Sequence, residues 1–145
     1  MNTHWHQDHT GGNENLVNNG ATVIAHENVR ERLSTEQFVD FLNKTFEASP
    51  LNALPTINYN DSITFYFNDD KIDVYHIPNT HTDGDSIIYF SKRNVIHTGD
   101  LYVNGRYPFI DHSSGGLIDG LIIGIEKIIS IIDKETKIIS GHGLL

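Results

Sequence analysis

The stretch Thr3-His4-Trp5-His6-Gln7-Asp8-His9-Thr10-Gly11-Gly12 decides how this chain is interpreted. It places three imidazoles and one carboxylate between His4 and His9, too close together for a helix or strand to separate them. Imidazole and carboxylate are the ligands that zinc prefers when thiolates are absent, and the chain contains no cysteine. The pattern therefore predicts a metal site. The alternative interpretation is a solvated N-terminal tail, because short motifs carry false positives.

Composition limits the remaining possibilities. The chain has 145 residues, of which 38% are hydrophobic and 20% charged, which fits one domain spanning residues 1–145. The net charge is −9 and the basic residues are scattered, so no nucleic-acid partner is predicted. The most apolar stretch, residues 117–132, is interrupted by Asp119, Glu126 and Lys127, so no membrane partner is predicted either.

Periodicity predicts alternating helices and strands, hence an α+β class. The expected helices cover residues 13–18, 26–33, 34–46 and 117–132, and the expected strands cover 22–25, 63–67, 72–75, 86–90, 95–98 and 137–140. Residues 50–55, between two prolines, are predicted to be a loop that forms a wall or lid over a site. Gly116, Gly120 and Gly124 recur every four residues, which we interpret as close packing of the last helix on a sheet.

Three further candidates, His81, Asp100 and His142, each follow a predicted strand within a polar or glycine-flanked loop. Strand ends at one edge of a sheet lie close together, so these residues are expected to meet the N-terminal motif. Taken singly, each would more often be a loop residue or a helix cap than a ligand. The complete set of candidate ligands is His4, His6, Asp8, His9, His81, Asp100 and His142. This set is too large for one zinc ion and fits two ions that share a carboxylate and a water.

The motif, followed in order by His81, Gly99-Asp100 and Gly141-His142-Gly143, resembles the metallo-β-lactamase superfamily over nearly the whole chain. The resemblance implies an αββα sandwich with two metal ions at one edge between two sheets. It implies that His4, His6 and His81 hold the first ion, that Asp8, His9 and His142 hold the second, and that Asp100 bridges them. Asp8 and Asp100 are then the predicted catalytic residues.

The residue at position 100 indicates which groups within the superfamily the chain resembles. The thiolate-using lactamases have a cysteine there and are excluded, and the other zinc β-lactamases have a serine. A bridging aspartate is typical of hydroxyacylglutathione hydrolases, lactonases and many other hydrolases of the superfamily. The superfamily's nucleases fit poorly with the acidic charge balance.

The resemblance also predicts that the chain is truncated. Strands that precede the motif in the superfamily, and the element that commonly closes it, are missing here. We therefore expect the ligand-bearing loop to have only one anchored end, and we expect an exposed sheet edge that would favour a homo-oligomer. The compartment stays open: the chain as given is expected to be soluble and cytoplasmic, unless the missing N-terminus carries a signal peptide.

The predicted activity is hydrolysis of a small carbonyl compound (an ester, thioester, lactone or lactam) by a metal-bridging hydroxide, with Asp8 or the metal-bound water protonating the leaving group. Two zinc ions are expected, with iron as the alternative. One rival interpretation is a mononuclear iron dioxygenase; flavodiiron proteins fit less well, because they carry a glutamate where His6 stands. The other rival is an inactive or incomplete metal-binding fragment.

Several other residues are secondary candidates. Asp83 and Asp85 flank His81 and are candidates to orient it, although turn residues are the slightly favoured interpretation. His97 is a candidate to support Asp100, with a buried structural histidine as the favoured alternative. The aromatic candidates for pocket walls are Tyr102, Tyr107 and Phe109, and the histidines outside the ligand pattern are His26, His76, His97 and His112.

Overall fold

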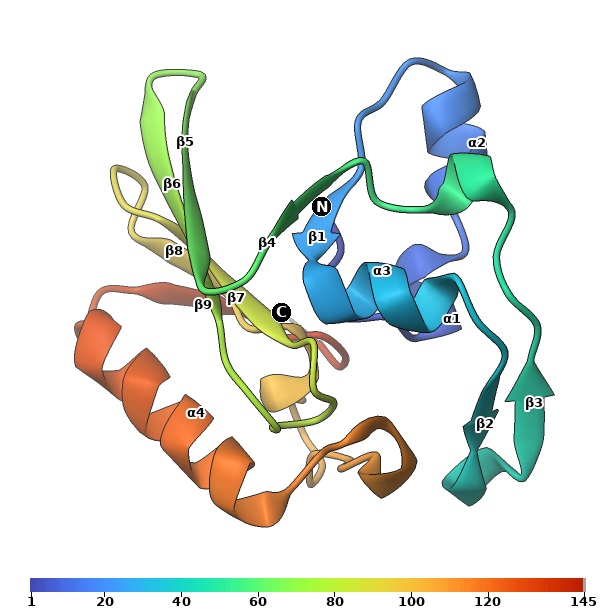
Figure 1. Cartoon of the computed structure of the whole chain (residues 1–145). Coiled ribbons are helices and arrows are strands. Elements are labelled where there is room, and N and C mark those ends of the chain that lie inside the picture. The colour runs from blue at the N-terminus through green and yellow to red at the C-terminus, as the bar shows by residue number, and fades with distance from the viewer. Residues whose placement is uncertain (145) are drawn as a thin grey trace.

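The computed structural model describes residues 1–144 as a mixed fold of helices and strands (Figure 1). Its largest element is a five-stranded sheet with the spatial order β5-β6-β7-β8-β9. Neighbouring strands are antiparallel, except that β9 runs parallel to β8. The strands are β5 (Ser62–Phe67), β6 (Asp70–His76), β7 (Ser86–Phe90), β8 (Val95–His97) and β9 (Lys137–Ile139).

The predicted hairpin in residues 62–75 is confirmed as β5 and β6. The turn between them uses Asn68 and Asp69, whose φ angles are 49° and 61°. Asparagine and aspartate tolerate this left-handed conformation, which suits a two-residue hairpin turn because its twist matches that of the strands.

The long predicted helix is confirmed as α4 (Ile118–Ile131), which connects β8 to β9 and lies against one side of the sheet (Figure 1). No helix within residues 1–144 is long and apolar enough to cross a membrane. The helix and the sheet enclose a buried cluster made of Ile77, Ile87, Ile96, Leu101, Leu121 and Ile128.

The glycine row of α4 permits close packing, mainly against the segment that follows β6. A Cβ atom on Gly120 would lie 1.8 Å from the carbonyl oxygen of Asn79, and one on Gly124 would lie 2.9 Å from Ile77 Cγ2. The row thus sets the distance between the helix and residues 77–80, the segment that leads to His81.

The other half of the fold contains a short parallel pair, β1 (Ile24–His26) and β4 (Ile57–Tyr59). Helix α3 (Glu27–Leu33) follows β1 directly and begins with the His26 imidazole accepting a hydrogen bond from the Asn28 amide. Two short helices, α1 (Gln7–Thr10) and α2 (Asn13–Asn18), come first in the chain. A second buried cluster joins β1 and α3 to residues from outside them, and it consists of Trp5, Ala25, Val29, Leu33, Val39 and Leu54.

The helix predicted over residues 34–46 is wrong. This segment is an antiparallel hairpin of β2 (Gln37–Val39) and β3 (Lys44–Phe46), joined by a 3₁₀ turn at residues 40–42 and by Asn43 with a φ of 47°. A helix would have gathered the apolar residues on one buried face. The hairpin instead buries Val39 and leaves Phe41 exposed, so the spacing that resembled a helical stripe has another origin.

Strand direction explains how the distant candidates meet. Strands β6, β8 and β9 all run in the same direction, because β7 is antiparallel to both β6 and β8, and β9 is parallel to β8. Their carboxyl ends therefore lie at one edge of the sheet. His81, Asp100 and His142 follow these three ends, as the sequence predicted.

A pair of stacked imidazoles connects the two halves of the fold. The rings of His26, at the end of β1, and His76, at the end of β6, lie 3.6 Å apart at an angle of 15°. His76 also donates from Nδ1 to the carbonyl oxygen of Asp85 at 3.0 Å. Burial and the neighbouring His26 lower the pKa of His76 from 6.5 to about 4.

We expect Gly120→Ala to lower the free energy of unfolding by roughly 3 kcal/mol, because its methyl group would overlap the backbone of Asn79. Chemical denaturation measures this change. Ile123→Ala on the exposed face of α4 is the matched control and should change stability far less. Equal effects of the two substitutions would contradict the packing described for the glycine row.

We expect protonation of His76 to destabilise the fold between pH 6.5 and pH 4. A folded pKa of about 4 means that the unfolded chain binds more protons in this window, so the free energy of unfolding falls as the pH decreases. In His76→Phe, which keeps an aromatic ring but cannot titrate, the decline should be shallower. Denaturation curves recorded across this window compare the two proteins, and identical slopes would contradict the expectation.

Candidate metal centre

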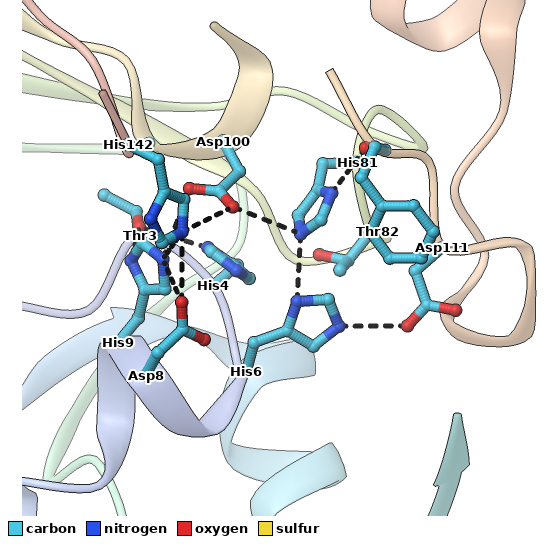
Figure 2. Close-up of polar contacts among 12 residues, drawn as sticks. Thr3, His4, His6, Asp8, His9, His81, Thr82, Asp100, Asp111 and His142 are labelled. Atoms are coloured by element: carbon cyan, nitrogen blue, oxygen red, sulfur yellow. Dashed lines mark hydrogen bonds and ion pairs between the residues drawn. The ribbon is translucent and has the colours of Figure 1, made fainter. Parts of the chain in front are cut away.

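The structure brings all seven predicted ligands together (Figure 2). The N-terminal loop and α1 supply four of them, and the ends of β6, β8 and β9 supply the other three. Potential ligand atoms lie within 4.8 Å of one another in three overlapping groups. The first group is His4 with His6 and His81, and the second is Asp8 with His9 and His142; a further group, His4 with His9 and Asp100, overlaps both.

The N-terminal loop is anchored on both sides of the motif, so the expectation of one anchored end is wrong. The Asn2 amide donates to the Ile24 carbonyl at 3.0 Å, and the Ser86 amide donates to the Thr3 carbonyl at 2.9 Å. The Asn2 side chain also donates to the His9 carbonyl. Contacts with β1 and β7 therefore hold the loop where a preceding strand was expected to do so.

The imidazoles of the first group are oriented by acceptors outside it. His81 donates from Nδ1 to the Phe109 carbonyl at 2.7 Å, and His6 donates from Nε2 to Asp111 Oδ2 at 3.0 Å. Both outer partners only accept, so the remaining ring nitrogens, His81 Nε2 and His6 Nδ1, carry lone pairs in the neutral rings. These two nitrogens face each other at 2.9 Å. Such an arrangement repels unless a proton or a metal ion lies between the lone pairs.

A second observation points to the same place. Within residues 1–144, three buried side-chain atoms form no hydrogen bond, and two of them, His4 Nε2 and Asp100 Oδ1, belong to this cluster; Oδ1 has only an ionic contact with His9 Nε2. Buried polar atoms are almost always paired, so unpaired ones need an explanation such as an ion. The donor set therefore fits a metal ion at this position.

Asp100 lies between the two groups (Figure 2). Its Oδ2 is 3.8 Å from His81 Nε2 and 3.3 Å from His142 Nε2, and its Oδ1 is 3.2 Å from His9 Nε2. A Cβ atom on Gly141 would lie 2.0 Å from Oδ1. The glycine before His142 thus leaves room for this carboxylate.

Asp8 completes the second group from the exposed side. Its Oδ2 lies 3.0 Å from His142 Nε2 and 3.3 Å from His9 Nε2. The side chain of Asp8 is 56% exposed, whereas that of Asp100 is only 10% exposed. The two carboxylates therefore differ in their surroundings: Asp100 is enclosed between the two groups, and Asp8 faces solvent.

Electrostatics within the cluster favour the metal-binding protonation states of His4 and Asp100, but not that of His9. Burial, followed by the neighbouring imidazoles, lowers the pKa of His4 well below 6.5, which keeps its ring neutral. Burial opposes ionisation of Asp100, but the neighbouring imidazoles, His9 above all, together outweigh burial and lower the pKa of Asp100. Burial likewise opposes protonation of His9, but Asp100 and the other nearby carboxylates together outweigh it and raise the pKa of that imidazole. Neutral imidazoles and ionised carboxylates are the forms that bind a metal.

The sequence did not reveal two of the supporting groups, the Phe109 carbonyl and Asp111. Asp111 is buried, and it accepts hydrogen bonds from the Ser113 and Ser114 hydroxyls as well as from His6. These contacts outweigh burial and lower the pKa of Asp111. Ser114 also accepts from the Trp5 indole nitrogen at 3.1 Å. The sequence does show a run of polar residues at 111–114, but the spacing of this run does not predict a contact with His6.

The flanking aspartates have structural roles instead of direct contact with His81. Asp83 forms a bidentate pair with Arg32. Asp85 is buried and accepts from the Thr80 hydroxyl and the Thr82 amide, so it fixes the loop that carries His81. The favoured interpretation of both as turn residues thus describes their contacts better than direct orientation of the ring.

A cavity of about 610 Å³ lies beside the cluster. Some of the remaining candidates line this cavity and others do not. Tyr107 and Phe109 line this cavity, as predicted, whereas Tyr102 does not. His97 accepts a hydrogen bond from the Gly99 amide, and His112 lies by the Gly116 carbonyl. The proposed lid, residues 50–55, contributes Pro50 and Ala53 to a different cavity, so that prediction is wrong. The β2–β3 hairpin forms the wall instead.

Comparison with known proteins gives a consistent result. The family model of the metallo-beta-lactamase superfamily matches residues 1–142. A hydroxyacylglutathione hydrolase from Pelagibacter ubique (strain HTCC1062) is 26% identical over 144 residues. The match covers 98% of this chain and 50% of that relative, so the chain spans about half the length of the relative.

Solved structures show the same fold. A metallo-beta-lactamase from Pontibacter korlensis superimposes with a TM-score of 0.75 at 18% identity, covering 99% of this chain and 60% of its own. The structure of TTHA1623 in a di-iron-bound form superimposes with a TM-score of 0.76 at 22% identity, covering 98% of this chain and 68% of its own. The predicted metallo-β-lactamase-like fold is thus confirmed.

We expect Asp111→Ala to weaken metal binding about 10- to 100-fold, because the His6 ring would lose the acceptor that fixes its orientation. Competition with a chromogenic chelator measures the affinity. Asp119→Ala removes an exposed carboxylate in the first turn of α4 and should leave the affinity as it is. An unchanged affinity in Asp111→Ala would show that the contact with His6 is dispensable.

Proposed function

Because the chain belongs to the metallo-beta-lactamase superfamily, we propose that its seven clustered side chains bind two metal ions and that the site hydrolyses a small carbonyl compound. The observation that carries this proposal is the pair of facing lone pairs on His6 and His81, beside the unpaired Nε2 atom of His4. These three nitrogens are close enough together to coordinate one cation. The superfamily includes hydrolases such as the hydroxyacylglutathione hydrolase.

The contacts of Asp100 support a second ion. This carboxylate approaches an imidazole of the first group through Oδ2 and both imidazoles of the second group through its two oxygens. A carboxylate that reaches both groups suits a bridge between two ions. We propose that His4, His6 and His81 hold one ion, that Asp8, His9 and His142 hold the other, and that Asp100 contacts both.

The remaining chemistry divides between the ions and the protein. Bound ions supply Lewis acidity, which polarises a carbonyl and lowers the pKa of water. The chain supplies the neutral His4 imidazole, the enclosed charge of Asp100 and a cavity beside them. Asp8 is the exposed carboxylate of the cluster and lines that cavity, so it is placed to pass a proton to the leaving group.

We propose zinc as the native ion, since nitrogen and carboxylate donors without thiolates suit it. The same donors also suit iron, and one structural neighbour was solved in a di-iron-bound form. Elemental analysis of purified protein distinguishes the two ions. Iron at one ion per chain, together with oxygen consumption and no hydrolysis, would favour the dioxygenase alternative.

Thioesters are the first substrates to test. The name of the Pelagibacter relative describes hydrolysis of a hydroxyacylglutathione, and thioesters are among the carbonyl compounds that such a site can attack. Esters and lactones share the same electrophilic carbon and belong in the same assay. The proposed partner is thus a small molecule.

We expect the double variant His4→Ala, His6→Ala to lose the first ion and to lose at least a hundredfold in hydrolytic rate, because two of the three donors of that group disappear. Elemental analysis and thioester, ester and lactone assays measure the two losses. Unchanged activity at full metal loading would exclude the assignment.

A control is required because His4 is buried and its removal can affect folding. His112→Ala removes an imidazole outside the three groups and should keep both metal content and activity. Circular dichroism shows whether the double variant retains its fold. Chelation of the wild-type protein, followed by readdition of zinc, should abolish and then restore activity without any substitution.

A further inference from the structure

The β2–β3 hairpin forms one wall of the cavity beside the proposed metal site. Its contributing residues are Val39, Phe41, Leu42, Lys44 and Phe46. The opposite wall includes Val103, Arg106, Tyr107 and Phe109. The hairpin carries none of the seven proposed ligands, so its side chains contribute to what the cavity accepts.

The cavity lining carries two cations without acidic partners. Neither Lys44 nor Arg106 forms an ion pair among the described residues. By contrast, four other basic side chains do so: Arg32, Lys71, Lys92 and Arg93. The only carboxylates that line the cavity, Asp8 and Asp100, belong to the proposed metal site. Lys44 and Arg106 thus place two positive charges on the part of the lining outside the proposed metal site, in a chain whose net charge is −9.

The same walls expose unusually large apolar surfaces. Phe41 is 75% exposed, Leu42 is 54% exposed and Tyr107, on the opposite wall, is 96% exposed. Exposed apolar side chains that gather around a cavity mark a surface for an apolar ligand. The lining therefore combines apolar contacts with positive charge.

Contacts hold the hairpin in this position. The rings of Phe41 and Phe109 lie 4.7 Å apart, and the Asp40 amide donates to the Ser113 hydroxyl at 3.2 Å. Lys44 Nζ lies 4.5 Å from the centre of the Phe46 ring, a distance typical of a cation–π contact. This contact places the ammonium group at the cavity wall.

We propose that the β2–β3 hairpin selects carbonyl substrates in which an apolar segment ends in a carboxylate, and that Lys44 is a specificity-determining residue for that carboxylate. The apolar segment would lie against Phe41 and Leu42, and the carboxylate would pair with the Lys44 ammonium. Arg106 adds positive charge from the opposite wall. This inference rests on the proposed hydrolytic function, because it assigns the substrate class of the same site.

The test compares two esters of equal length with the zinc-loaded protein: mono-para-nitrophenyl adipate, which carries a terminal carboxylate, and para-nitrophenyl hexanoate, which does not. We expect the wild type to prefer the adipate ester in kcat/KM. Lys44→Gln should reduce the ratio of the two kcat/KM values about tenfold, which is the size of one charge-assisted contact. Lys44→Arg should largely restore the ratio, and Lys44→Glu should lower it further.

Lys134→Gln is the matched control, because it removes an exposed lysine that does not line the cavity. This variant should keep the wild-type ratio. Added salt should reduce the adipate preference in the wild type, since screening weakens charge pairing, and should have little effect in Lys44→Gln. A ratio that Lys44→Gln leaves unchanged would overturn the assignment of Lys44.

Binding of uncleaved analogues separates this inference from the proposed function. Calorimetry with adipic acid monoanilide and with hexananilide should show tighter binding of the monoanilide, and Lys44→Gln should remove the difference. If the wild type cleaves neither these esters nor the thioesters and lactones but retains this preference, the proposed hydrolysis fails and the ligand class stands. If it cleaves both esters without preference and binds both anilides equally, hydrolysis stands and the inference fails.

Discussion

The mutual repulsion of nitrogen lone pairs is the constraint on which the candidate site depends. His6 and His81 each direct one ring N–H outward, to a carboxylate and to a carbonyl, and so leave two acceptor nitrogens facing each other at 2.9 Å. The neutral His4 ring adds a third nitrogen without a partner. Burying such a group without a cation costs the fold free energy. A bound cation would convert this cost into binding energy, so metal binding and stability are expected to be coupled.

The fold meets this constraint by fixing backbone segments more than side chains. Three parallel strand ends bring His81, Asp100 and His142 to one sheet edge. The buried Asp85 then holds the loop around His81, while glycines at 120 and 141 allow α4 and the last turn to approach closely. Substitutions at these positions would displace the ligands, although none of these residues is itself a proposed ligand. The site is therefore supported from both halves of the molecule, since Trp5 in the other core contacts Ser114, which in turn contacts Asp111.

The sequence predicted the parts of this arrangement that local chemistry determines. The dense His and Asp motif and the three residues after strands identified every member of the cluster, because ligand type and strand ends are local properties. Asp111 and the Phe109 carbonyl were missed because their relation to His6 and His81 exists only after the loop after β8 folds over the site. The hairpin at residues 37–46 was missed for a related reason. Its apolar residues are spaced like a helical stripe, but Phe41 and Leu42 line a cavity, whereas Val39 packs in a core.

The hairpin and the cluster also differ in what constrains them. Each proposed ligand lies close to several other side chains of the cluster, so a change in one imidazole disturbs the others. Phe41 and Leu42, in contrast, are largely exposed, and the hairpin touches the site mainly through the Phe41–Phe109 contact and one hydrogen bond to Ser113. Its exposed side chains can therefore vary at little cost in stability, since exposed substitutions seldom change it much. Under the proposed function, such a fold would separate the reaction from its selectivity: the strand ends would hold the reacting groups, and the hairpin would select the molecule that reaches them.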